Sequence, residues 1–363
     1  MSQNLVDLSK AGVSIWLDDL SRERLQTGTL AELISGSSVV GVTTNPSIFS
    51  AAISGSDRYA ADIKSLAAAG KNVDQIVTQL TTDDVRAACD LFKPTFDATH
   101  GADGRVSIEV EPGLAYDTAT TIARGIELAK IVDRQNLLIK VPATLEGLPA
   151  IQALTAAGIS VNVTLIFSVE RYVAVMNAYL AGLEERVAKG ESISDIHSVA
   201  SFFISRIDSE IDKRLDAIAA GSPLRGKIAV SNAHLAYEAF LTVAASDRWK
   251  ALAAAGANFQ RPLWASTGVK DKAYESTRYV IELVAAHCVN TMPEGTLNEV
   301  RAHGVVRGDT ITSQIPAAHS LLADLATAGV DFADVVKFLE DDGVAKFQVA
   351  WKELLANIEA VAK

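Results

Sequence analysis

The chain has 363 residues, of which 49% are hydrophobic, and it carries a net charge of −11. This length suits two average domains or one large α/β barrel with additions. Lysine and arginine are spread along the chain without a basic run, which argues against binding to nucleic acid or to an anionic membrane surface. A phosphorylated substrate would therefore need a local cluster of cations.

Sequence signals for export, metal binding or cofactor binding are missing. Residues 1–12 lack the apolar core of a signal peptide, and no apolar run approaches the roughly eighteen residues of a membrane span. Cys89 and Cys288 lie far apart, the six histidines show no paired spacing, and there is no glycine-rich nucleotide loop. We expect a cytoplasmic protein with reduced thiols that uses no metal and no cofactor and binds no membrane.

Short apolar runs that end at turn residues predict strands. These runs cover residues 14–19, 39–45, 105–111, 137–144, 160–167, 199–205, 262–267 and 287–292. Helical spacing predicts helices over residues 22–35, 46–64, 73–80, 82–95, 117–133, 147–157, 169–187, 228–245 and 273–286. The alanine-rich tail predicts further helices over 296–303, 315–328, 331–342 and 344–362.

Eight strands, each followed by a helix, specify an α/β fold of the (β/α)8 TIM barrel type. We expect one domain over residues 1–363, with the barrel strands between about 14 and 293. The remaining residues, 294–363, are expected to form a helical C-terminal extension packed on the barrel. Segment 228–231 could also be a strand, but the apolar spacing from Ala229 to Phe240 favours a helix.

Lys140 lies inside the apolar run 137–144, which is too short for a helix. A lysine is almost never fully buried without a partner. Desolvation favours the neutral amine, which can attack a carbonyl and form a Schiff base. The alternative is a lysine paired with an acid or reaching back to water, and on this segment alone that alternative is the more common one.

Polar residues at the ends of the other strands change that balance, because the C-terminal ends of barrel strands meet at one face. They are Asp18, Asn45, Glu109, Asn162, Thr164, Ser201, Arg206, Ser266, Thr267 and Asn290, with Phe203 on the face of Ser201. A lysine, two acids, amide groups and a cation are what an imine-forming carbon–carbon lyase needs, because acids move protons and the cation binds phosphate. Taken singly, several of these residues could have a purely structural role. Asn45 could be a turn residue, Asn162 and Thr164 could form a buried hydrogen-bond network, and Arg206 could pair with Asp208 or Glu210.

Six segments in chain order carry a family resemblance. They are residues 43–47 (TTNPS), 107–110 (SIEV), 138–144 (LIKVPAT), 162–168 (NVTLIFS), 201–206 (SFFISR) and 264–267 (WAST). With these segments the chain resembles transaldolases, the Schiff-base-forming enzymes of the pentose phosphate pathway, in their longer bacterial form. The resemblance covers about residues 14–293.

The resemblance implies a role for each catalytic residue. Lys140 forms the Schiff base with a ketose phosphate, and Asp18 acts on the hydroxyl whose deprotonation breaks the C–C bond. Glu109 exchanges protons with the carbinolamine through a water that Thr164 orients. The first strand lacks the Thr-Gly that follows this aspartate in shorter members, so Asp19 stays open as an alternative to Asp18.

The resemblance also implies the substrate contacts. Asn45 and Asn162 bind the hydroxyls of the donor, with Ser201 beside them, and Arg206 holds the sugar phosphate. Shorter members carry a second phosphate-binding arginine after strand seven, and here Lys270 takes that place.

The expected activity is therefore transfer of a dihydroxyacetone unit between sugar phosphates, without a cofactor, by a monomer or homodimer. One alternative is a fructose-6-phosphate aldolase-like lyase that releases free dihydroxyacetone. Those relatives carry a tyrosine where Phe203 stands, so an apolar Phe203 favours transfer. The other alternative is a barrel that binds sugar phosphate without catalysis, and it is expected to have lost Lys140 or an acid.

Overall fold

The computed structural model of the chain describes residues 2–363. Within this range eight parallel strands close into a barrel in chain order, and the last strand pairs with the first. The strands are β1 (Val13–Leu17), β2 (Val39–Val42), β3 (Arg105–Glu109), β4 (Leu137–Pro142), β5 (Val161–Ile166), β6 (Ser198–Phe203), β7 (Gln260–Ala265) and β8 (Cys288–Met292). The predicted (β/α)8 barrel is confirmed, and all of the predicted strands are present with slightly different ends.

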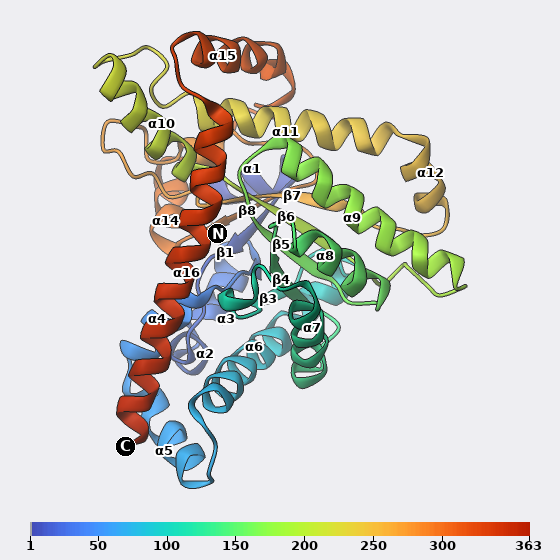
Figure 1. Cartoon of the computed structure of the whole chain (residues 1–363), viewed down its shortest axis with the longest axis vertical. Helices are drawn as coiled ribbons and strands as arrows, with labels where there is room; N and C mark the ends of the chain where they lie inside the picture. The colour runs from blue at the N-terminus through green and yellow to red at the C-terminus, as the bar shows by residue number, and fades with distance from the viewer. Residues whose placement is uncertain (1) are drawn as a thin grey trace.

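Helices surround the barrel and extend beyond it (Figure 1). The first half holds α1 (Gln3–Lys10), α2 (Arg22–Thr27), α3 (Thr29–Gly36), α4 (Pro46–Ser54), α5 (Ala60–Ala68), α6 (Val73–Ala98), α7 (Thr118–Val132) and α8 (Gly147–Ala156). The second half holds α9 (Val169–Ala188), α10 (Ser205–Ile218), α11 (Ile228–Ala245), α12 (Asp247–Ala254), α13 (Arg278–Ile281), α14 (Glu294–His303), α15 (Ile315–Thr327) and α16 (Phe332–Ala362). The helical prediction for 228–245 is confirmed, whereas α1, α10 and α12 were not predicted.

Several predicted helix boundaries are wrong because glycines act differently from the sequence expectation. The predicted helix 22–35 is two helices, α2 and α3, divided at Gly28, which has the left-handed φ of 85° that favours glycine. The predicted helix 46–64 likewise stops at Gly55, and α5 begins later. Near the C-terminus the reverse holds, since α16 continues through Gly343 where a break was predicted.

The predicted break in α6 between residues 80 and 82 is also wrong. Thr82 does not cap a new helix, because its hydroxyl donates back to the carbonyl of Thr78 at 2.7 Å in the preceding turn. The true start of α6 is a capping box in which Asn72 and Gln75 each bind the other's backbone N–H. The helix is therefore continuous from Val73 to Ala98.

Only the short helix α13 is present where a helix over 273–286 was predicted. Side chains take the hydrogen bonds of the backbone in this segment, which competes with the helical pattern. Thr277 is bound by Glu275, and the backbone N–H of Val284 donates to the hydroxyl of Thr310 at 3.0 Å. The segment after β7 is thus mainly a loop.

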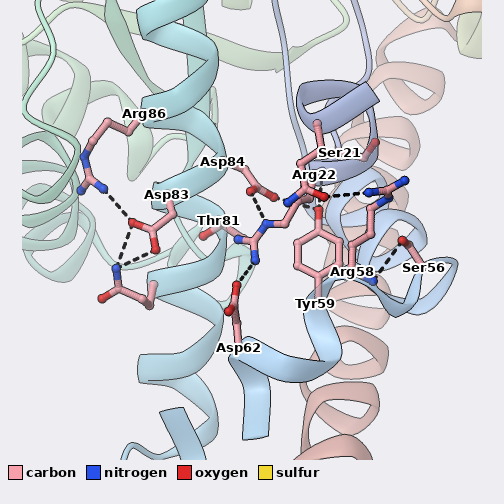
Figure 2. Close-up of polar contacts among 12 residues, drawn as sticks. Ser21, Arg22, Ser56, Arg58, Tyr59, Asp62, Thr81, Asp83, Asp84 and Arg86 are labelled. Carbon is pink, nitrogen blue, oxygen red and sulfur yellow. Dashed lines mark hydrogen bonds and ion pairs between the residues drawn. The ribbon is translucent and has the colours of Figure 1, made fainter. Parts of the chain in front are cut away.

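An ion-pair cluster around the buried Arg22 and Asp84 fixes α2 against α5 and α6 (Figure 2). The guanidinium of Arg22 donates to Asp84 at 2.9 Å and also binds Asp62, and it lies 4.6 Å from the ring centroid of Tyr59. The hydroxyl of Tyr59 in turn donates to Asp84 at 2.8 Å. Because α2 directly follows β1, this cluster holds the end of the strand after which Asp18 lies.

The C-terminal helix α16 runs along one side of the barrel, where it contacts α4, α5, α6 and α10 (Figure 1). At Gly343 an added Cβ would lie 3.0 Å from Cδ2 of Leu165 in β5, so the glycine permits close approach of this helix to the barrel. The organisation of the whole chain as one domain stays a prediction. None of the helices within residues 2–363 has the length and hydropathy that a membrane span requires.

Candidate active site

A cavity of about 580 Å³ lies at the C-terminal ends of the strands. Its lining includes Asp18, Asn45, Lys140, Thr164, Ser201, Phe203, Arg206 and Lys270 from the predicted site. Glu109 and Asn162, the other two predicted residues, do not line the cavity and lie next to residues that do. The predicted site is therefore brought together around one space.

Lys140 lies at the floor of this cavity on β4, a strand in which every residue is buried. In the sheet register it stands beside Glu109 of β3 on one side and Asn162 of β5 on the other. Its Nζ atom donates to the carbonyl oxygen of Thr44 at 3.0 Å and lies 3.2 Å from Oε2 of Glu109. The side chains of this ion pair are only 5% and 3% exposed, so water is largely excluded from the amine.

Glu109 supplies a buried carboxylate next to that amine. Burial raises its pKa above the ordinary value for glutamate, and the neighbouring charge of Lys140 opposes this rise. Within residues 2–363 neither of its oxygens, nor the buried hydroxyl of Thr164, receives a hydrogen bond of normal geometry. Glu109 and Thr164 thus keep hydrogen-bonding capacity for a further polar group.

Asp18 and Asp19, which the sequence left as alternatives, have different surroundings. Asp18 lines the cavity, and its Oδ1 accepts a hydrogen bond of 2.6 Å from Thr43. Asp19 points to Arg24, with an ion pair of 2.6 Å. Burial raises the pKa of Asp18, while the charge of Lys140 lowers it to a smaller extent. Of these two aspartates, Asp18 therefore lines the cavity that holds Lys140 and Asp19 does not.

The two predicted asparagines are already engaged in the structure. Asn162 donates from Nδ2 to Ser107 at 2.9 Å and accepts from the hydroxyl of Ser201 at 2.7 Å. Asn45 caps α4 by accepting from the backbone N–H of Ile48 at 3.0 Å. The cap uses only the Oδ1 atom of Asn45, so its Nδ2 group remains a donor at the cavity.

Arg206 is the second residue of α10, just beyond β6, and it is not paired with Asp208 or Glu210, so the structural interpretation of this residue is wrong. Asp208 accepts from Tyr279 at 2.8 Å, and Glu210 pairs with Arg214 at 2.8 Å. Within residues 2–363 the Nη1 atom of Arg206 is buried and has no hydrogen-bond partner. Its pKa is lowered mainly by burial.

Aromatic rings flank the guanidinium of Arg206. Its central carbon lies 5.1 Å from the ring centroid of Phe203 and 5.9 Å from that of Phe347, which are cation–π distances. Phe347 also lies 5.9 Å from Nζ of Lys140. Phe347, which belongs to α16, therefore covers both cationic groups.

Sequence reasoning missed the part of the cavity that distant segments supply. These residues are Thr43, Ser209, Glu210, Lys213, Ala265, Gly268, Thr291, Pro293, Phe338, Leu339, Asp342, Lys346 and Phe347. The signal for Thr43 was its place in the segment 43–47, whereas no local pattern marked the residues of α16. The lining holds five lysine or arginine side chains, which are Lys140, Arg206, Lys213, Lys270 and Lys346. They form the local cluster of cations that a phosphorylated substrate needs in a chain of net negative charge.

Comparison with known proteins points to one family. Residues 15–358 match the family model described as Transaldolase/Fructose-6-phosphate aldolase. The chain is 59% identical to "Transaldolase 1" of Streptomyces avermitilis over 99% of this chain and 95% of that protein. It is 58% identical to the "Transaldolase" of Mycolicibacterium smegmatis (97% and 95% covered) and 57% identical to that of Mycobacterium tuberculosis CDC 1551 (98% and 96% covered).

Proposed function

We infer that this chain, which belongs to the transaldolase/fructose-6-phosphate aldolase family, is a transaldolase. In this proposal it moves a dihydroxyacetone unit between sugar phosphates of the pentose phosphate pathway. The donor is sedoheptulose 7-phosphate or fructose 6-phosphate, and the acceptor is glyceraldehyde 3-phosphate or erythrose 4-phosphate. The observation that carries the proposal is the amine of Lys140, buried 3.2 Å from Glu109 at the floor of a cavity lined with cations.

The first chemical step forms the Schiff base. Glu109 accepts a proton from the ammonium of Lys140, and the neutral amine attacks the C2 carbonyl carbon of the ketose. A proton moves from nitrogen to the former carbonyl oxygen and gives a neutral carbinolamine. Glu109 then returns its proton to this hydroxyl, which leaves as water while the C=N bond forms. The unpartnered oxygens of Glu109 and Thr164 support a bound water as the carrier of this proton.

The second step breaks the C3–C4 bond of the donor. Asp18 takes the proton of the C4 hydroxyl, C4 becomes the carbonyl carbon of the departing aldose, and the bond electrons move into the iminium to give an enamine. A carboxylate whose pKa is raised by burial is a better base for this proton than an ordinary aspartate. Attack of the enamine on a new aldehyde then reverses the step, and Asp18 returns the proton to the new hydroxyl.

Substrate binding is divided along the cavity in this proposal. Arg206 binds the phosphate with its unpartnered Nη1 atom, and Lys270 assists from the loop after β7. Asn45 and Ser201 bind hydroxyls of the donor. Asn162 acts by holding Ser201, because Asn162 does not itself line the cavity and its Oδ1 accepts a hydrogen bond from the Ser201 hydroxyl.

A lyase that releases free dihydroxyacetone is not favoured. The relatives at 56–59% identity are named transaldolases. Phe203 contacts Phe167 with ring centroids 5.3 Å apart, an apolar pair that has no group to activate a hydrolytic water. The alternative of an inactive barrel loses its basis because Lys140, Asp18 and Glu109 are all present.

We further propose a cytoplasmic location. We also propose that the chain is a monomer or a homodimer, and size-exclusion chromatography of the purified chain tests this oligomeric state.

Trapping of the intermediate tests the central proposal. Fructose 6-phosphate is added alone, so that the enamine has no acceptor, and borohydride reduces the imine to a stable secondary amine. Mass spectrometry of a digest is expected to find a three-carbon adduct on Lys140 and on no other lysine. Lys140→Ala is expected to lose both the adduct and transfer to erythrose 4-phosphate, whereas Lys346→Ala, a matched change in the same cavity, keeps the adduct. An adduct on another lysine, or full turnover by Lys140→Arg, would overturn the assignment.

A further inference from the structure

A second cavity, of about 530 Å³, lies at the other end of the barrel from Lys140. It is bordered by the end of α6 and by the segments that lead into β3, β4, β5 and β6. Arg105, the first residue of β3, lines this cavity, whereas Glu109 at the last position of the same strand faces Lys140. The proposed catalytic chemistry uses none of the residues that line this second cavity.

Arg105 is a buried arginine that has no anionic partner in the described part of the chain, residues 2–363. The residue is 1% exposed, and its Nε donates to the carbonyl oxygen of Gly101 at 2.5 Å. Its guanidinium carbon lies 5.2 Å from the ring centroid of Phe96. Within residues 2–363 both of its Nη atoms are buried and have no hydrogen-bond partner. Buried polar groups are nearly always hydrogen-bonded, and an unpaired charge is the most costly exception.

The carboxylates around Arg105 are used by other cations or lie outside reach. Asp97 is paired with Lys93 at 2.6 Å, and Asp103 is paired with Arg261 at 3.1 Å. Asp195, the remaining carboxylate of the cavity, is exposed to solvent and makes no ion pair among residues 2–363. No direct contact among residues 2–363 therefore neutralises the positive charge of Arg105.

A second nitrogen converges on the same space. An added Cβ at Gly101 would lie 3.2 Å from Nη2 of Arg105 and 3.1 Å from Nε2 of His197, so both nitrogens lie against this glycine at the edge of the cavity. Burial and the charges of Arg105 and Arg261 lower the pKa of His197 to about 3. An anion placed between these groups would relieve the excess of positive charge that opposes protonation of His197.

We propose that this cavity binds a small oxyanion, such as phosphate, through the two Nη atoms of Arg105, with His197 as a neighbouring contact. A guanidinium presents two parallel donors that match two oxygens of a phosphate, sulfate or carboxylate. Arg134 lines the same cavity but is already bound in a bidentate pair with Asp90 at 2.6 and 3.0 Å. The oxyanion is thus assigned to Arg105 and not to the rim arginine.

Calorimetric titration with inorganic phosphate at constant ionic strength tests the proposal. The full chain carrying Arg206→Ala is the starting protein, since this change weakens phosphate binding in the active-site cavity. It is expected to bind one phosphate, and adding Arg105→Met is expected to weaken that binding about tenfold or more. The matched control, Arg134→Met in the same background, is expected to leave the affinity unchanged within about twofold, because that guanidinium already has its partner.

A second measurement does not depend on the folding of the Arg105 variant. In the Arg206→Ala protein, the side-chain nitrogen signals of His197 are followed by NMR during the phosphate titration and assigned with His197→Gln. These signals are expected to shift with the affinity that calorimetry reports, while those of the exposed His319 stay in place. Unchanged His197 signals, or equal phosphate affinities with and without Arg105→Met, would overturn the proposal. Neither outcome bears on the Schiff-base chemistry, which the trapping experiment tests separately.

Discussion

Replacing Arg206 by alanine is expected to separate phosphate recognition from chemistry. The guanidinium lines the active-site cavity, contacts Phe203 and Phe347, and has a buried Nη1 atom without a hydrogen-bond partner within residues 2–363. Among residues 2–363 no carboxylate forms a direct ion pair with Arg206, so its removal leaves no directly paired carboxylate without its partner. We therefore expect Arg206→Ala to fold, with its loss confined to phosphorylated substrates.

The size of this loss follows from the type of contact. A hydrogen bond between a charged donor and a phosphate contributes about 1.5–3 kcal/mol. At about 1.4 kcal/mol for each factor of ten, KM for glyceraldehyde 3-phosphate should rise about 10- to 140-fold. Lys213 provides the matched control, because it lines the same cavity with a side chain that is 77% exposed. An exposed charge contributes at most about 1 kcal/mol, so Lys213→Ala should raise KM by less than about fivefold.

Steady-state transfer from sedoheptulose 7-phosphate to two acceptors provides the measurement. The acceptors are glyceraldehyde 3-phosphate and unphosphorylated glyceraldehyde, each at varied concentration with the donor at saturation for the variant. Arg206→Ala is expected to lose most of the preference for the phosphorylated acceptor, while Lys213→Ala keeps it. Equal losses of kcat/KM on both acceptors would refute the reasoning and assign Arg206 a structural role.

Three further changes test other parts of the site. The pKa of Asp18 is higher in the folded than in the unfolded state, so ionised Asp18 lowers the stability of the fold above the unfolded pKa, and this cost disappears as the pH falls. Asp18→Asn should therefore abolish turnover yet raise Tm at pH 7, with a gain that shrinks towards pH 4. A lower Tm at pH 7 would contradict this argument. Phe203→Tyr should increase the rate at which free dihydroxyacetone is released from fructose 6-phosphate when no acceptor is supplied, and an unchanged rate of release would argue against a water-excluding role for the ring. Gly343→Ala should lower both Tm and turnover, because the new Cβ would lie 3.0 Å from Leu165, whereas Gly295→Ala on α14, where an added Cβ meets nothing within 4 Å, should do neither.

The barrel and most of its candidate site could be predicted because both depend on local patterns. Apolar runs with a period of two identify a strand and also say which residues share a face, so the sequence pattern alone places Thr164 on the same face as Asn162. Barrel closure then brings neighbouring strand ends together, which is why Lys140 and Glu109 occupy adjacent register positions. The hydrogen bonds of Asn162 could not be predicted, because Ser107 is close to it only through the register of three strands.

Helix boundaries were predicted wrongly at residues that resemble a helix stop or a helix cap but have another role in the structure. Gly343 resembles a helix stop in sequence, yet its function is to let α16 approach Leu165, which is far away in the chain. Thr82 resembles a cap, yet the hydroxyl binds its own helix while the adjacent turn supplies Asp84 to Arg22 (Figure 2). At Gly343 a tertiary contact thus overrides the local preference, whereas at Thr82 a hydrogen bond within the same helix does so.

Phe347 shows why the C-terminal helix belongs to the argument about function. Its ring lies 5.9 Å from both Nζ of Lys140 and the guanidinium carbon of Arg206, so one side chain from the tail covers the nucleophile and the phosphate-binding group. A ring in this position excludes water from the amine, and exclusion of water strengthens every charge interaction in the cavity. Because α16 approaches Leu165 of β5 closely at Gly343, one turn before Phe347, the glycine that looks like a break in the sequence positions the residue that closes the proposed active site.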